Sequence, residues 1–118
     1  MTYAKFAEAE IRLENDRISA EDADRQKRAA IEVLTRLRRQ PGVILADEVG
    51  MGKTFVALAV AVSILLVSSD DRPVVVMYPP SLREKWPKDW DTFKSKCLPE
   101  LLRGRFRAAT ANSGILHE

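Results

Sequence analysis

One nine-residue stretch constrains the fold of this chain more than any other feature: Ala46-Asp47-Glu48-Val49-Gly50-Met51-Gly52-Lys53-Thr54. Gly50 and Gly52 carry no Cβ, so the backbone can turn tightly and aim several N–H groups at a phosphate chain. Lys53 supplies a flexible cation for the β- and γ-phosphates, and Thr54 supplies a hydroxyl for Mg²⁺. The stretch therefore predicts a phosphate-binding loop.

The flanking segments support this prediction. The apolar run Val43-Ile44-Leu45 comes directly before the loop, and a helix-length apolar run follows it from Phe55. A helix that begins at the loop directs its positive dipole end towards the anion. The strict motif has glycine where this chain has Asp47, so only the core Gly-x-Gly-Lys-Thr is met. We predict that the nucleotide-binding residues of this segment are Asp47, Glu48, Val49, Gly50, Met51, Gly52, Lys53 and Thr54, with Thr54 on the metal.

Composition sets the limits of the remaining argument. The 118 residues suffice for one domain, and a net charge of +2 does not by itself indicate a nucleic-acid partner. The single cysteine, Cys97, cannot form an internal disulfide, and the N-terminus has no early apolar block, so we expect a cytoplasmic protein. The apolar run from Phe55 to Val67 is shorter than the roughly 20 residues that span a bilayer, which predicts a buried helix and no membrane contact.

Hydrophobic periodicity, capping residues and breakers predict an α/β chain. We expect N-terminal helices over residues 1–40 and a partial nucleotide-binding lobe over residues 41–118. In chain order, the expected elements are a solvent-facing helix over 3–16, a helix from Ser19 to about Gln40, a strand over 43–45, a helix over 54–67, a strand over 74–78, and a helix capped by Ser81 that ends near Lys96. The two strands would lie parallel in a right-handed strand-helix-strand unit. Trp86, Trp90 and Phe93 are spaced as the buried face of the last helix.

Two segments together resemble a known family. The loop sequence, the apolar helix after it and then Val-Val-Val-Met-Tyr-Pro-Pro-Ser-Leu, with Trp86 four residues on, resemble motifs I and Ia of Swi/Snf-type ATPases in helicase superfamily 2. Gln26 lies upstream of the loop, as the adenine-reading Q-motif glutamine does in that family. The resemblance covers about Gln26 to Phe93, which is most of the chain.

The resemblance implies a P-loop NTPase fold of the RecA-like type, with a three-layer parallel sheet. Such a lobe clamps ATP against a second lobe, absent from this sequence, and moves along double-stranded DNA. It implies that Lys53 holds the phosphates, Thr54 the metal and Gln26 the adenine. It also implies that Ser81, Arg83 and Lys85 contact the DNA backbone. The structural alternatives are a polar helix residue for Gln26 and a simple helix cap for Ser81.

The chain also departs from the family. Nothing after Phe93 resembles the Asp-Glu-x-His of motif II, and Asp70-Asp71 lies in a predicted turn. Without that carboxylate, the water-positioning group and the arginine finger, phosphoryl transfer loses most of its acceleration. We expect the N-terminal part of a DNA translocase that binds ATP without hydrolysing it. The alternatives are a stand-alone non-catalytic nucleotide-binding or regulatory module and a small P-loop kinase; the Pro-Ser-Leu-Trp segment argues against the kinase.

Overall fold

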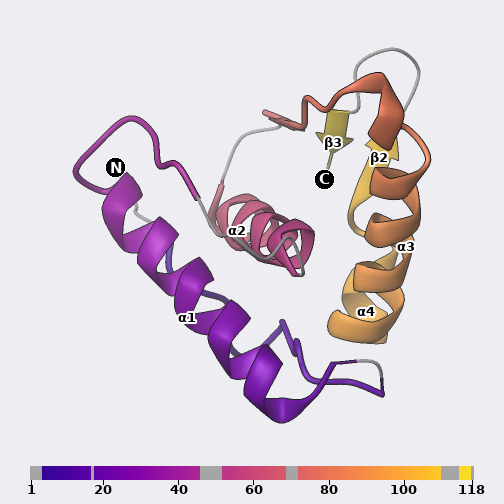
Figure 1. Ribbon diagram of the computed structural model, residues 1–118, viewed down its shortest axis with the longest axis horizontal. Helices are drawn as coiled ribbons and strands as arrows, with labels where there is room; N and C mark the ends of the chain where they lie inside the picture. The colour runs from indigo at the N-terminus through magenta and orange to yellow at the C-terminus, as the bar shows by residue number, and fades with distance from the viewer. Residues whose placement is uncertain (1–3, 17, 46–51, 69–71, 110–114, 118) are drawn as a thin grey trace.

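The computed structural model describes residues 4–16, 18–45, 52–68, 72–109 and 115–117. The elements in chain order are α1 (Ala20–Leu37), α2 (Lys53–Val67), β1 (Val74–Val75), a 3₁₀ turn η1 (Pro80–Leu82), α3 (Lys85–Cys97), α4 (Glu100–Arg103), β2 (Arg107–Ala109) and β3 (Ile115–His117). Helix α2 packs on both α1 and α3 and lies between them (Figure 1). No helix in the described ranges combines the length and apolar character needed to cross a membrane.

Helix α1 begins where its cap predicts. The Ser19 hydroxyl accepts a hydrogen bond from the backbone N–H of Asp22 at 3.2 Å, and Glu21 and Asp22 occupy the first turn, where the helix dipole favours acidic side chains. The buried face of α1 consists of Ala23, Gln26, Ala30 and Leu34. Three of these side chains are apolar, so Gln26 is the polar exception on this face.

Helix α2 forms the centre of the core. Leu58, Ala59 and Val62 are at most 1% exposed, because the helix is covered on two sides by α1 and α3. This result confirms the predicted helix over a run that is rich in β-branched residues. The buried Ser63 hydroxyl accepts a hydrogen bond from the backbone N–H of Ala7 at 3.2 Å, which fixes the N-terminal segment to the same core.

The predicted helix over residues 3–16 is wrong. Residues 4–16 contain no helix and form irregular chain with a turn at 8–10 and bends at 15 and 16. Ile11 and Leu13 are both buried, and this spacing of two is the period of extended chain. The backbone N–H of Arg12, between them, donates to the carbonyl oxygen of Cys97 at 2.8 Å. Tertiary contacts of this kind outweigh the helix propensity of the segment.

The predicted parallel sheet is also wrong for the residues that the structure describes. Residues 43–45 are not a strand, and Ile44 is 91% exposed. Strand β1 covers Val74 and Val75 only and pairs antiparallel with β3, which also pairs antiparallel with β2, so the strand order is β1-β3-β2. A run of three apolar residues makes few ladder hydrogen bonds, so it becomes a strand only where a neighbour is available.

Helix α3 presents the face that its aromatic spacing predicts. Phe93 is fully buried and Trp90 is 5% exposed, with Trp86 partly buried against the same cluster. The Phe93 ring stacks on the rings of Trp90 and Phe55, each with a centroid distance of 6.2 Å. These contacts join α3 to α2 through the centre of the molecule.

Cys97, at the end of α3, makes a contribution to the free energy of unfolding that depends on pH. Burial raises the pKa of its thiol from 9.0 to about 11, and the hydrogen bond from the Asn15 amide opposes this rise. The folded chain therefore holds the thiol proton more tightly than the unfolded chain. This contribution is complete below pH 9 and is lost as the pH rises towards 11.

We expect the difference in free energy of unfolding between the wild type and Cys97→Ala to shrink across this window, by at most about 1.4 kcal/mol per pH unit. Urea unfolding of both proteins at pH 8, 9.5 and 10.5 measures it. The alanine variant corrects for every other group that titrates at alkaline pH. A difference that stays constant over the three pH values would contradict the assignment.

Candidate nucleotide site

The described part of the predicted loop begins at Gly52. This glycine has φ +89°, in the left-handed region that favours glycine, and its carbonyl oxygen accepts the first hydrogen bond of α2, from the N–H of Val56 at 3.0 Å. Helix α2 thus begins at Lys53, which is half-buried, followed by the buried Thr54. The other predicted loop residues, Asp47, Glu48, Val49, Gly50 and Met51, lie outside the described residues.

Gln26 reaches the loop from α1. A Cβ placed on Gly52 would lie 3.1 Å from Cδ and 3.3 Å from Cγ of Gln26, and it would collide with Nε2. Only glycine therefore fits against this side chain. Gln26 is 8% exposed, and its Oε1 is buried with no hydrogen-bond partner among the described residues. An unsatisfied buried acceptor is costly, so this oxygen is suited to a donor from a ligand.

The hydroxyl group of Thr54 contacts a lysine ammonium group. The ammonium group of Lys85, at the start of α3, donates a hydrogen bond to Thr54 Oγ1 at 2.9 Å and forms an ion pair with Asp89 Oδ2 at 2.6 Å. Lys85 and Asp89 lie one turn apart on α3, the spacing at which opposite charges pair. Sequence reasoning placed Lys85 on DNA and missed Asp89. The Lys-x-x-x-Asp spacing on a predicted helix was the signal for the ion pair.

The local field at this end of α2 favours an anion. The first turn of α2 contains no acidic residue, and its leading N–H groups have no partner within the helix. Lys53 and Lys85 add two positive charges, and the Asp89 carboxylate pairs with Lys85. A helix N-terminus with adjacent lysines is the arrangement that binds phosphate groups in proteins.

Ser81 was predicted to cap a helix, and both Ser81 and Arg83 were predicted to contact DNA. Ser81 lies inside η1, which begins after Pro79, and α3 begins after Glu84 without a side-chain cap, so the predicted capping by Ser81 is wrong. Both Ser81 and Arg83 are exposed. Their contact with DNA stays a prediction.

The residues present fit a nucleotide with Mg²⁺. Thr54 is 9% exposed, and its hydroxyl oxygen already accepts a hydrogen bond from a cation, the Lys85 ammonium. Mg²⁺ commonly takes only one or two protein ligands and completes its shell with water and phosphate oxygens. Among the described residues, no group of three His, Cys, Asp or Glu side chains is placed to hold a metal.

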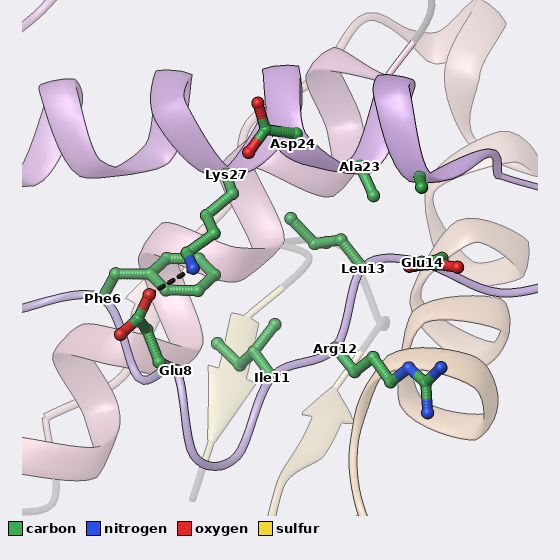
Figure 2. A pocket seen from close by; sticks show the side chains of 10 residues that line it. Phe6, Glu8, Ile11, Arg12, Leu13, Glu14, Ala23, Asp24 and Lys27 are labelled. Carbon is green, nitrogen blue, oxygen red and sulfur yellow. Dashed lines mark ion pairs between the residues drawn. The ribbon is translucent and has the colours of Figure 1, made fainter.

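A separate hollow of about 260 Å³ lies between the N-terminal segment and α1 (Figure 2). Lys27 crosses it, pairs with Glu8, and places its Nζ 5.9 Å from the centroid of the Phe6 ring. None of the predicted site residues lines this hollow. It is therefore distinct from the loop, although Gln26 on α1 directly precedes Lys27.

Comparison with known proteins assigns the family. The family model described as "Type III restriction enzyme, res subunit" matches residues 19–116, well over half of the chain. No curated protein and no solved structure gives a significant match. The match confirms the predicted relationship to helicase superfamily 2, whose restriction-type ATPases use ATP with Mg²⁺ and act on DNA. The chain belongs to the family of the type III restriction enzyme res subunit.

Proposed function

We propose that this chain is the ATP-binding N-terminal part of a Swi/Snf-like ATPase that couples ATP hydrolysis to movement along double-stranded DNA. The contact of Gln26 with Gly52 is the observation that carries the proposal. It brings a buried, unsatisfied amide oxygen to the phosphate-binding loop from a helix outside the motif. A polar helix residue with no ligand role would be expected to find solvent or a protein partner.

In this proposal each site residue has one task. Lys53 and the N–H groups at the start of α2 bind the β- and γ-phosphates, the hydroxyl of Thr54 binds the metal, and Gln26 accepts a hydrogen bond from the adenine amino group. When bound, Mg²⁺ neutralises phosphate charge. These contacts act on substrate and transition state alike, so they produce affinity without acceleration.

The proposal therefore separates binding from hydrolysis. The carboxylate of motif II, the oriented water and the arginine finger supply the interactions that strengthen in the transition state. The described site contains no counterpart of them, and the printed sequence has no Asp-Glu-x-His. Hydrolysis then requires the second lobe, with DNA phosphates contacted by Ser81, Arg83 and Lys85 in the complete enzyme.

The test compares the wild type with Lys53→Ala by titration calorimetry with ATP and Mg²⁺. We expect weak binding by the wild type and a loss of roughly 10- to 100-fold in the variant, the equivalent of one hydrogen bond to a charged group. Lys88→Ala is the matched control, because Lys88 is an exposed lysine on α3. Phosphate release should stay at background with and without duplex DNA.

Equal affinities of the wild type and Lys53→Ala would refute the phosphate-binding loop. Turnover that disappears in Lys53→Ala would instead show a complete active site, and it would refute the separation of binding from hydrolysis.

A further inference from the structure

Lys85 donates a hydrogen bond to Thr54 Oγ1, the oxygen atom that a nucleotide-bound metal would need as a ligand. Its ammonium lies 2.9 Å from Thr54 Oγ1, and the Thr54 side chain is nearly inaccessible to solvent. A Mg²⁺ ion binds a hydroxyl oxygen at about 2.1 Å and takes its ligands in octahedral geometry. Two cations on one oxygen atom would stand a few ångströms apart, where their repulsion is strong in a partly buried site. Lys85 and the metal therefore exclude each other at Thr54.

Asp89 holds Lys85 by a contact that does not depend on Thr54. The carboxylate pairs with the ammonium at 2.6 Å and lies on the same helix, one turn further on. The side chain of Lys85 is 51% exposed, so its flexible stem is free to swing away from α2 while the ion pair persists. The Asp89 side chain is 25% exposed, so its carboxylate is partly shielded from solvent and its attraction for the ammonium is less screened.

We propose that Lys85 is the resident cation of the metal subsite in the nucleotide-free chain, and that it gives up its contact with Thr54 when Mg²⁺ binds with ATP, while it stays paired with Asp89. This inference rests on the proposed function. It assigns to Lys85 a task at the metal, and it makes the α2–α3 contact sensitive to the nucleotide. Magnesium affinity is then lowered by the cost of moving Lys85.

The experiment measures ATP affinity by calorimetry at saturating Mg²⁺ and again in EDTA, for the wild type, Lys85→Met and the control Lys88→Met. Methionine keeps the length of the lysine stem and removes the charge. We expect the ratio of the two affinities to rise roughly three- to tenfold in Lys85→Met, as removal of one nearby like charge implies. The ratio should not change in Lys88→Met. In EDTA, Lys85→Met should bind ATP no more tightly than the wild type.

In a second variant, Asp89→Asn, the ratio of the two ATP affinities should change in the opposite direction. Loss of the carboxylate leaves the displaced ammonium uncompensated beside the metal, so the ratio should fall below that of the wild type. If Lys85 only attaches α3 to α2, Lys85→Met lowers the melting temperature and leaves the ratio unchanged, which overturns the inference alone. If the wild type binds no ATP in either buffer, the proposed function and the inference both fail.

Discussion

Phe93→Ala is expected to lower the free energy of unfolding by about 3–5 kcal/mol, the usual cost of removing a large aromatic side chain from a core. The Phe93 side chain is fully buried, and its ring stacks on Phe55 from α2 and on Trp90 from its own helix. Its removal would leave a cavity between two helices, and the stacked rings on each side would lose their contact partner.

Urea unfolding followed by circular dichroism measures this loss, with Asp91→Ala as the control. Asp91 lies on the same helix and is exposed, so its replacement should stay within about 0.5 kcal/mol of the wild type. Since small domains have only about 5–15 kcal/mol of stability, Phe93→Ala should lose a large share of it and unfold at a much lower urea concentration than the wild type. A loss below about 1 kcal/mol would mean that neighbouring side chains fill the cavity and that Phe93 is not a main contributor to the stability of the core.

Helices α1, α2 and α3 were predictable because their signals are local, whereas the helix predicted over residues 3–16 rested on composition and is wrong. Ser19 begins α1 with a side-chain cap, and the length of the apolar run after Lys53 distinguishes a buried helix from a strand. The buried face of α3 follows from the spacing of Trp90 and Phe93. Each of these signals lies within a few residues of the element that it specifies.

The strands were not predictable in the same way. Residues 43–45 and 74–78 have equal apolar character, yet only Val74 and Val75 pair, and their partner is β3 at residues 115–117. Strand formation depends on a distant partner more than on intrinsic preference. A pairing across some forty residues leaves no trace in the local pattern, and the family's parallel sheet suggested the wrong neighbour.

The candidate site also combines features that the local sequence predicts with contacts that depend on the tertiary fold. The motif predicts the roles of Lys53 and Thr54, because these residues are consecutive in the chain and their sequence order sets where their side chains lie. The contacts of Gln26 with Gly52 and of Lys85 with Thr54 connect different helices and depend on how α1 and α3 pack on α2. The family resemblance marked Gln26 and Lys85 as candidates, whereas their contacts with Gly52 and Thr54 are visible only in the fold.

Gly52→Ala should remove ATP binding and also lower the free energy of unfolding by about 1–3 kcal/mol, and the two effects share one cause. An L-residue at φ +89° is strained by roughly 1–2 kcal/mol, and here the new Cβ would also collide with the amide of Gln26. Relief of this clash requires either Gln26 to leave its buried position or the loop to shift away from α1. Either movement separates the amide of Gln26 from the backbone at Gly52, the two groups to which the proposed function assigns the adenine and the phosphates.

Two further variants separate the clash from the strain. Gly104→Ala is the matched control, because Gly104 has φ −86° and no atom within 4 Å of an added Cβ, so it should be neutral or slightly stabilising. Gly52→Ala combined with Gln26→Ala removes the collision and keeps the positive φ, so it should recover part of the lost stability but none of the ATP binding. Urea unfolding and calorimetric titration of the four proteins give both quantities. Full stability of the single Gly52→Ala variant would contradict the close contact between α1 and the loop, and restored ATP binding in the double variant would show that Gln26 has no part in holding the nucleotide.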